Sequence, residues 1–348
     1  MKAIVFKGPK DFEMQEIPMP LCPEEGILVK VEAVGLCGSD IRTFDVGHGK
    51  LIPPQVIGHE VVGVIESIGE NISDFSVGDK VAVNPIIPCG HCDYCKMGFG
   101  NHCQELEFLG TTIPGGYAQY VAIPKVALVN DCVIKITNNL PMEQVPLAET
   151  TASVICAQKN MGVGKGDTVL IFGAGPIGCL HAVIAKARGA KKVIMSEINE
   201  SRLDLVRRFT SIDVFVDSSQ QDVHEIVLAE TNNLGADAAI VACPVGLVQE
   251  QAIDMVRKRG RVCFFGGLPI NNCHINLNSN RIHYDEIAIY GAFAYAPKDF
   301  IEAFHLISEG KVPAAEFVTH ILPLKDIAEG IDIIKKGLGI KVVLKPWD

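Results

Sequence analysis

The sequence predicts a two-domain α/β protein, in which a β-rich part is joined to a doubly wound parallel sheet. The 348 residues are enough for two separate hydrophobic cores. The first third is rich in Gly and Pro and contains short β-type runs bounded by turn residues. From about Thr151, apolar strands alternate with helical stretches, which is the pattern of a parallel sheet covered by helices.

The expected elements follow from these patterns. In the β-rich part the strand candidates are Ile27–Val34, Val61–Ile68 and Lys80–Val83. In the second part they are Val169–Phe172, Val193–Ser196, Val214–Asp217, Ala238–Cys243, Arg261–Phe265 and Ile287–Tyr290, with helices such as Ile177–Arg188 and Glu200–Phe209 between them. The chain then continues with two helices and a closing strand, over Phe300–Gly310, Leu324–Lys336 and Lys341–Leu344.

Composition narrows the class of protein. Hydrophobic residues make up 48% and charged residues 21% of the chain, as in ordinary globular proteins. A net charge of -10 without a long Lys/Arg run argues against a nucleic-acid partner. No stretch has the roughly 18–20 apolar residues of a membrane helix, and the first residues lack the apolar core of a signal peptide. We therefore expect a cytoplasmic protein with no membrane partner.

A glycine-rich turn follows the strand candidate that ends at Phe172. The turn is G-x-G-x-x-G, made by Gly173, Gly175, Pro176, Ile177 and Gly178, and an apolar helical stretch follows it. In this setting the first glycine permits the tight turn, the second lets a pyrophosphate approach the backbone, and the third lets the helix pack closely. The helix N-terminus then offers free N–H groups to phosphates. The turn predicts a dinucleotide site.

Glu197, nineteen residues after Gly178, stands just past the next strand candidate. A carboxylate there can accept hydrogen bonds from both ribose hydroxyls and would repel a 2′-phosphate. This favours NAD over NADP. Arg202 lies nearby and would weaken that preference.

Twelve cysteines occur in the chain, and four of them crowd into a short segment as Cys89-x-x-Cys92-x-x-Cys95-x7-Cys103. Four thiolates at these spacings can surround one tetrahedral zinc and leave no position for a substrate, so this zinc is predicted to be structural. A redox CxxC would need only two cysteines, and an iron–sulfur cluster is the other alternative. His91 and His102 lie in the same loop as competing ligands.

Three separated motifs supply a second set of metal ligands. Cys37 lies in Cys-Gly-Ser-Asp, His59 and Glu60 lie in Gly-His-Glu-Val-Val-Gly, and Glu149 lies in Leu-Ala-Glu-Thr. Taken singly, each is explained as a buried cysteine, a surface histidine or a solvated glutamate. Together, a thiolate, an imidazole and a carboxylate are the mixed set of a catalytic zinc with an open position.

These motifs carry a resemblance to a known family. Gly58-His59-Glu60-x-x-Gly63-x5-Gly69 resembles the signature of the zinc-containing medium-chain alcohol dehydrogenases, and the other motifs occur in that family's order along the whole chain. The resemblance implies a GroES-like catalytic domain over residues 1–151 and 293–348, with a zinc lobe at about residues 85–110. It also implies a Rossmann NAD-binding domain over residues 152–292, and a homodimer or homotetramer.

The resemblance also implies roles for single residues. Cys37 and His59 would be zinc ligands, and Glu60 a ligand or a movable carboxylate beside them. Glu149 stands where the ethanol-type enzymes have a cysteine ligand, as in the polyol and threonine dehydrogenase branches. The family often has proline after this glutamate, where this chain has Thr150. Two zinc ions per subunit are expected, one catalytic and one structural.

The implied reaction is hydride transfer from a secondary alcohol to NAD, with zinc lowering the pKa of the substrate hydroxyl. Ser39 resembles the family's proton relay, and Arg42 stands where a histidine commonly ends it. The nearest branch resembles the sorbitol (L-iditol-type) dehydrogenases, although their Arg-Tyr pair is Ala294-Tyr295 here. The alternatives are a polyol-phosphate dehydrogenase (galactitol- or arabitol-phosphate type), an L-threonine 3-dehydrogenase, or a zinc-free nucleotide-binding relative without this activity.

Overall fold

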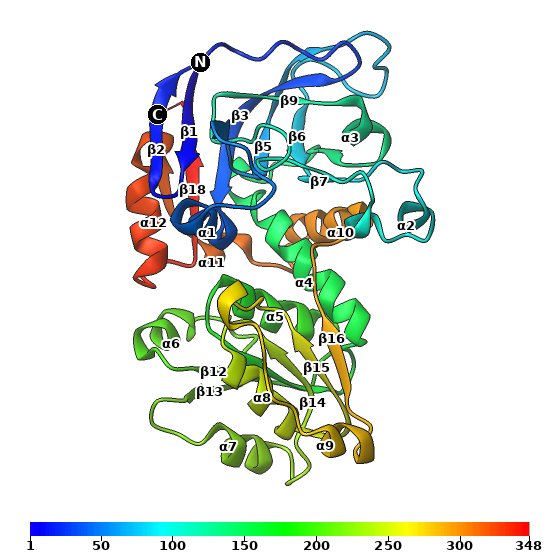
Figure 1. The fold of residues 1–348 in the computed structure, drawn as a ribbon, viewed down its shortest axis with the longest axis vertical. Coiled ribbons are helices and arrows are strands. Elements are labelled where there is room, and N and C mark those ends of the chain that lie inside the picture. Colours follow the sequence, from blue (N-terminus) through cyan, green and yellow to red (C-terminus); the bar gives the residue numbers. More distant parts are fainter. Residues whose placement is uncertain (348) are drawn as a thin grey trace. The chain divides into compact units, whose positions relative to one another are not determined.

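A computed structural model describes residues 1–347 (Figure 1). The chain forms two compact units. The first contains Met1–Ala152 together with the C-terminal segment that begins at Ala294, and the second contains Ser153–Phe293. The first unit is therefore built from both ends of the chain, and the second unit is inserted between them.

The first unit is organised around a seven-stranded sheet. Its strand order is β10-β6-β5-β3-β18-β17, and β9 also pairs with β3. These strands are β3 (Ile27–Leu36), β5 (Glu60–Ile68), β6 (Lys80–Val83), β9 (Tyr120–Ile123), β10 (Val133–Lys135), β17 (Val318–Pro323) and β18 (Lys341–Lys345). Strand β18 runs antiparallel to β3, with Val343 opposite Gly35. This pairing brings the end of the chain beside the residues that precede Cys37.

Short elements complete the first unit. A three-stranded sheet has the order β2-β1-β4, formed by β1 (Lys2–Gly8), β2 (Asp11–Glu16) and β4 (Gln55–Val56). The strands β7 (Ile86–Ile87) and β8 (Glu107–Phe108) form a separate pair. The helices are α1 (Gly38–Val46), α2 (Asp93–Lys96), α3 (Lys125–Val129), α10 (Pro297–Ser308), α11 (Ala314–Phe317) and α12 (Ile327–Lys335). Alternate residues of β3 and β5, such as Val31 and Ile65, are buried in the core of this unit.

The second unit is a six-stranded sheet of order β13-β12-β11-β14-β15-β16, and every pairing in it is parallel. The strands are β11 (Thr168–Phe172), β12 (Lys192–Glu197), β13 (Val214–Asp217), β14 (Ala236–Val241), β15 (Val256–Phe264) and β16 (Ala288–Gly291). The helices between them are α5 (Pro176–Ala187), α6 (Glu200–Val206), α7 (Val223–Glu230), α8 (Gly246–Asp254) and α9 (Ser279–Tyr284). The predicted doubly wound sheet is confirmed.

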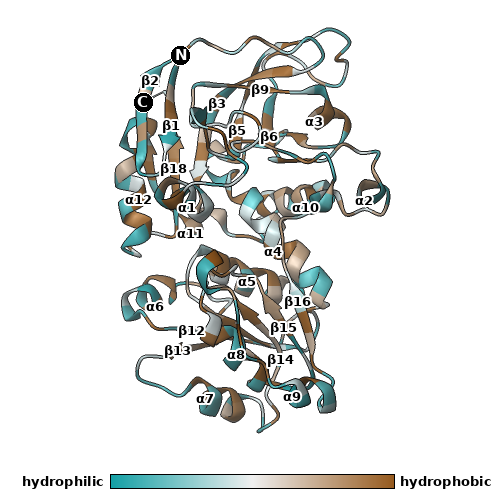
Figure 2. Cartoon of the chain, viewed as in Figure 1, coloured by the Kyte–Doolittle hydropathy of each residue, from teal (hydrophilic) through white to brown (hydrophobic). Residues whose placement is uncertain are grey.

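The hydropathy of the residues follows this layering. Figure 2 shows hydrophobic residues concentrated in the central strands of the second unit, while α7 and α12 carry both hydrophobic and hydrophilic residues. Strands with both faces covered are expected to be almost continuously apolar, and β11 is buried along its whole length. Among residues 1–347, no helix is long and apolar enough to cross a membrane.

Some boundaries differ from the sequence expectation. Strand β14 ends at Val241 rather than Cys243, and Pro244, which has no N–H to donate to a ladder, follows shortly after. Helix α4 (Leu147–Met161), which carries Glu149, has no counterpart among the expected helices. Its first five residues include two β-branched threonines of low helix propensity, and packing overrides that preference.

Candidate active site

The four residues of the second ligand set lie together in the first unit. Cys37 is the N-cap of α1, and Glu149 lies in the first turn of α4. Glu60 is the first residue of β5, and His59 directly precedes that strand. One ligand atom from each residue lies within 4.8 Å of the others. A thiol, an imidazole and carboxylates at this separation are a donor set that fits a single zinc ion.

A buried carboxylate orients His59. Asp40 lies in the first turn of α1, and its Oδ1 is 3.1 Å from Nδ1 of His59. Its Oδ2 accepts hydrogen bonds from the Tyr117 hydroxyl at 2.6 Å and from the Cys37 backbone N–H at 3.1 Å. Holding Nδ1 in this way leaves Nε2 of His59 for a metal, which is the common carboxylate–histidine–zinc arrangement.

Burial and charge act against each other on Asp40. Burial alone would raise the pKa of its carboxyl, but the nearby charge and hydrogen bond of His59, with the bond from Tyr117, lower that pKa instead. Asp40 is therefore an ionised acceptor for the imidazole. Asp40 is the last residue of the Cys-Gly-Ser-Asp motif, but its role beside His59 was not predicted from the sequence.

The glycines of the histidine motif are needed for close packing. Gly58 has φ of +91°, and a Cβ on it would stand 2.5 Å from the Tyr117 ring. A Cβ on Gly63 would stand 2.1 Å from a backbone carbonyl oxygen of β3, and one on Gly69 2.2 Å from a carbonyl oxygen of the turn before β3. These close approaches fix the strand that carries His59 and Glu60.

The two carboxylates of the cluster have different partners. Lys341 forms an ion pair with both oxygens of Glu60, and the Thr150 hydroxyl donates to Oε1 of Glu60 at 3.0 Å. The hydroxyl of Tyr295 donates to Oε1 of Glu149 at 3.2 Å. Burial is the main reason that the pKa of Glu149 is raised, with the charge of Glu60 adding to it. Tyr295 is fully buried against this carboxylate.

Lys341 was not expected at the site. A lysine within the apolar run Gly339-Ile340-Lys341-Val342-Val343 was the one available signal, because a charge in a buried strand needs a partner. Other residues singled out from the sequence are more exposed to solvent. Ser39, Arg42 and His48 are exposed residues on and after α1.

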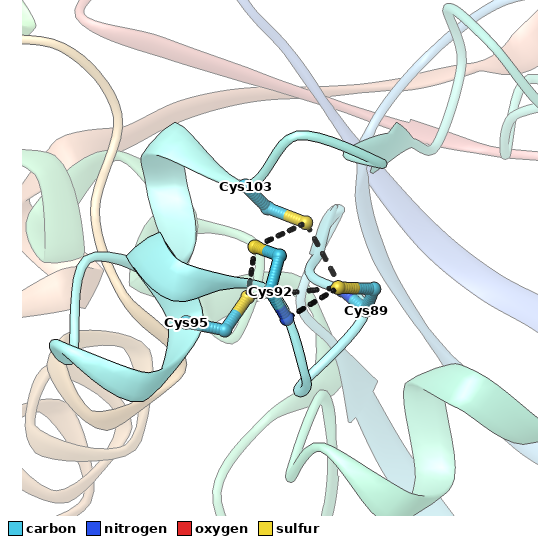
Figure 3. Close-up of side chains that lie close together, drawn as sticks. All are labelled: Cys89, Cys92, Cys95 and Cys103. Atoms are coloured by element: carbon cyan, nitrogen blue, oxygen red, sulfur yellow. Dashed lines mark hydrogen bonds between the residues drawn. The ribbon is translucent and has the colours of Figure 1, made fainter.

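The four cysteines of the lobe converge on one point (Figure 3). Sγ of Cys92 is 3.5 Å from that of Cys95 and 3.9 Å from that of Cys103, and Cys89 and Cys95 are 3.9 Å apart. Sulfurs about 2.3 Å from a central zinc would form a tetrahedron with edges of about 3.8 Å. The spacing of these sulfurs therefore fits a closed tetrahedral zinc site.

Backbone N–H groups face these sulfurs. The N–H of Cys89 donates to Sγ of Cys103 at 3.2 Å, and the N–H of Cys92 to Sγ of Cys89 at 3.4 Å. Hydrogen bonds from the backbone of Gln104 and Cys95 lower the pKa of the Cys92 thiol to about 6. Such donors favour the thiolate, which is the form that binds metal. His91 instead pairs with Glu105 at the surface.

The glycine-rich turn joins β11 to α5 in the second unit. Gly173 has φ of +105°, and a Cβ on Gly178 would stand 1.9 Å from the carbonyl oxygen of Gly173. A Cβ on Gly175, in contrast, would meet nothing within 4 Å. Gly175 is the N-cap of α5, and Pro176 and Ile177 open the helix. The structure thus leaves open space at the helix N-terminus where a pyrophosphate would bind.

Glu197, the last residue of β12, lies beside this turn. Its Oε2 accepts from the Ala174 N–H at 2.8 Å, and its Oε1 accepts from the Ile198 and Asn199 N–H groups at 2.9 and 3.1 Å. The carboxylate is thereby fixed in orientation, and each oxygen keeps lone-pair capacity for a ligand hydroxyl. Arg202 is partly exposed in the first turn of α6.

Comparison with known proteins covers both units. The chain matches the sequence profile of the Alcohol dehydrogenase GroES-like domain at residues 23–135 and that of the Zinc-binding dehydrogenase family at residues 176–309. A sorbitol dehydrogenase of Halalkalibacterium halodurans is 32% identical over 357 aligned positions, which cover 100% of both chains.

Solved structures agree with this similarity. A zinc-binding dehydrogenase of Sinorhizobium meliloti bound to NADP has a TM-score of 0.91 at 26% identity, over 99% of both chains. An alcohol dehydrogenase of Escherichia coli in complex with NADH has a TM-score of 0.89 at 26% identity, also over 99% of both. Galactitol-1-phosphate dehydrogenase of Escherichia coli has a TM-score of 0.88 at 25% identity, over 99% of this chain and 100% of that one.

Proposed function

We propose that this chain, which belongs to the zinc-binding medium-chain alcohol dehydrogenases, oxidises a secondary alcohol of a polyol to a ketose. The hydride passes to NAD. The observation that carries this proposal is the largely buried cluster of Cys37, His59, Glu60 and Glu149. A carboxylate in place of a second protein sulfur distinguishes this cluster from the ethanol-type site. The similarity to a sorbitol dehydrogenase over the whole chain supports the same substrate class.

Cys37, His59 and a carboxylate would hold the catalytic zinc, which when bound acts as a Lewis acid toward the substrate hydroxyl. The residues around it have separate tasks. Asp40 keeps His59 in one orientation, and Tyr117 and the N–H of Cys37 fix Asp40 in turn. Ser39, exposed in the first turn of α1, would accept the hydroxyl proton and release it to water.

A phosphorylated polyol is the second candidate substrate. Arg42, His48 and Lys50 are exposed. Partial burial of the imidazole is the main cause that lowers the pKa of His48, and the charges of Arg42 and Lys50 lower it further. Two cations close enough to act on one imidazole form a patch that suits a phosphate. The similarity to galactitol-1-phosphate dehydrogenase favours testing this candidate.

A substrate panel tests the proposal. Sorbitol, L-iditol, xylitol, galactitol 1-phosphate, arabitol phosphate and L-threonine are assayed with NAD by NADH absorbance. We expect the largest kcat/KM on an unphosphorylated polyol. Preference for a phosphate ester that Arg42→Ala reduces would favour the second candidate, and turnover of L-threonine alone would contradict both.

We expect the zinc content of variants to show that the two clusters each bind one zinc ion. Wild-type protein should hold about two zinc ions per chain, and Cys37→Ser and Cys95→Ser about one each, since each removes a ligand from a different set. Elemental analysis after gel filtration measures this. Cys273→Ser, at an exposed cysteine outside both clusters, is the matched control and should keep two. An unchanged zinc content in Cys37→Ser would contradict the proposed catalytic site.

Glu197 is proposed to set the preference for NAD. Its buried carboxylate would repel a 2′-phosphate, so Glu197→Ala should raise kcat/KM for NADP relative to NAD by about tenfold. The ratio is the useful measure, because any loosening of the turn affects both cofactors equally. Glu200→Ala removes the same charge from an exposed position on α6 and should leave the ratio unchanged. A wild-type enzyme that prefers NADP would show the proposed role to be wrong.

We also propose a cytoplasmic homo-oligomer, a dimer or tetramer. Strand β16 is an edge of the six-stranded sheet, and Ile289 and Phe293 on and after it expose 37% and 60% of their surface. An apolar sheet edge suits pairing with a second copy. Light scattering should give a multiple of the 37.5 kDa chain mass, and Ile289→Lys should lower it. A wild-type monomer would contradict this proposal.

A further inference from the structure

Another group of metal-binding side chains lies on the outside of the four-cysteine lobe. One ligand atom each from Cys89, His91 and Glu105 lies within 4.8 Å of the others. The side chains of His91 and Glu105 expose 71% and 64% of their surface, whereas Cys89 also belongs to the four-cysteine site. A thiolate, an imidazole and a carboxylate are a donor set that zinc accepts, and water can supply the remaining ligand.

The backbone of the lobe holds the His91 ring in the orientation of a metal ligand. Nδ1 is 3.1 Å from the carbonyl oxygen of Cys89, which can only accept a hydrogen bond, so Nδ1 carries the proton. Metal-binding histidines almost always donate their second ring N–H in this way. The lone pair of the neutral ring is then on Nε2, which faces a Glu105 carboxylate oxygen at 3.2 Å. A lone pair and a carboxylate that face each other need a cation between them.

The four-cysteine site would also fix the segments that carry these two side chains. The backbone N–H of Glu105 donates to Sγ of Cys103 at 3.3 Å. His91 lies in the chain between Cys89 and Cys92, which are two further ligands of the same site. A zinc ion held by the four sulfurs would therefore order the groups around a second ion, which lowers the entropy cost of binding it.

Charge favours a cation beside Cys89. Four thiolates carry two more negative charges than one divalent zinc ion neutralises. Backbone N–H groups face the sulfurs but carry no net charge, and the carboxylate of Glu105 adds a further negative charge nearby. A second divalent ion would offset this excess, and a thiolate sulfur has enough lone pairs to bind two metal ions at once.

We propose that Cys89, His91 and Glu105 form an outer metal site, which binds an exchangeable divalent ion and shares the Cys89 thiolate with the structural zinc. Sulfur and nitrogen ligands select zinc or cadmium over magnesium or calcium, which prefer oxygen. Because the outer site is exposed, its ion is bound more weakly than the enclosed one and is lost during gel filtration. The inference rests on the four-cysteine zinc site and is independent of the substrate.

Calorimetric titration tests the outer site without any activity measurement. Zinc chloride is added to untagged, zinc-loaded protein after gel filtration, and we expect one further ion per chain. His91→Ala and Glu105→Gln should each weaken this ion by about tenfold or more, because each removes a ligand. His102→Ala, at an exposed histidine of the same loop that belongs to none of the ligand groups found in residues 1–347, is the matched control. Magnesium chloride should give no binding at this site.

Two results of this titration would overturn the outer site. If wild-type protein takes up no further zinc, His91 and Glu105 form only a surface ion pair. If a further ion binds equally well to His91→Ala and Glu105→Gln, it lies at another surface position.

Cadmium NMR tests whether Cys89 is shared. In protein loaded with ¹¹³Cd, the ion held by four sulfurs gives a signal separate from that of the mixed-ligand catalytic site. Further cadmium should shift the four-sulfur signal in wild type and in His102→Ala, and the same addition should leave it unshifted in Glu105→Gln. A further ion that leaves the four-sulfur signal of wild type unchanged would overturn the sharing of Cys89. Loss of that signal in His91→Ala before any addition would also overturn the proposal, because His91 would then support the inner ion.

The outer site and the proposed function can fail separately. If no polyol is oxidised but the further ion binds as described, the proposed function fails and the outer site stands. If polyols are oxidised but no further ion binds, the outer site fails and the function stands.

Discussion

Cys37→Ser is expected to abolish alcohol oxidation while NADH still binds. The serine hydroxyl is a much poorer zinc ligand than a thiolate, and the thiolate is one of the two charges that would balance the ion. Lewis-acid stabilisation of a developing negative charge is worth several kcal/mol, so turnover should fall by about three orders of magnitude or more. NADH affinity should remain within about twofold of wild type, because the glycine-rich turn belongs to the other unit.

The measurement pairs turnover on the best substrate with NADH titration by calorimetry. Cys132→Ser is a useful comparison, since Cys132 is buried in the same unit and lies outside both metal clusters. It should affect stability more than turnover. Full turnover in Cys37→Ser would exclude the zinc mechanism, whereas loss of NADH binding would indicate general misfolding instead.

The fold was largely predictable because its signals are local. Each signal lies within a short stretch of sequence, such as the apolar run Thr168–Phe172 with the glycine turn and helical stretch that follow it. These signals predicted the parallel sheet, which the structure confirms. Helix α4 was missed because its helical state depends on packing and not on its own threonines. The β17 strand was missed for a similar reason, since only pairing with β18 defines it.

The site residues that lie in sequence motifs could be predicted from the sequence. Those that only the pairing of distant strands brings to the site could not. Cys37, His59 and Glu149 are far apart in sequence, and family resemblance brought them together before any distance was known. Lys341 lies 281 residues after Glu60, and only the antiparallel β18–β3 pairing places it beside that carboxylate. No sequence spacing encodes such a contact. Thr150 was visible as a departure from the family pattern, but its bond to Glu60 was not.

Gly178→Ala and Gly175→Ala are expected to impair NADH binding for different reasons. A Cβ on Gly178 would stand 1.9 Å from the carbonyl oxygen of Gly173, so the turn must open even without cofactor. Overpacking of this kind costs about 1–3 kcal/mol, which should lower Tm by several degrees. Gly175 has φ of -79° and ψ of -179°, which alanine adopts without strain, and its Cβ would meet no protein atom. Its Tm should stay within about 1 °C of wild type.

Both variants should nevertheless bind NADH at least about tenfold more weakly. In Gly178→Ala the N–H groups of the turn are displaced, whereas in Gly175→Ala they remain in place and the methyl group occupies the position of the pyrophosphate. Calorimetric titration and thermal unfolding distinguish the two causes. If Gly175→Ala bound NADH normally, the open space beside that glycine would not be the pyrophosphate site. If Gly178→Ala kept its Tm and its NADH affinity, the contact with Gly173 would not constrain the turn. The pair thus separates the two demands on this loop, since Gly178 serves the packing of α5 on its own turn and Gly175 keeps space free for the ligand.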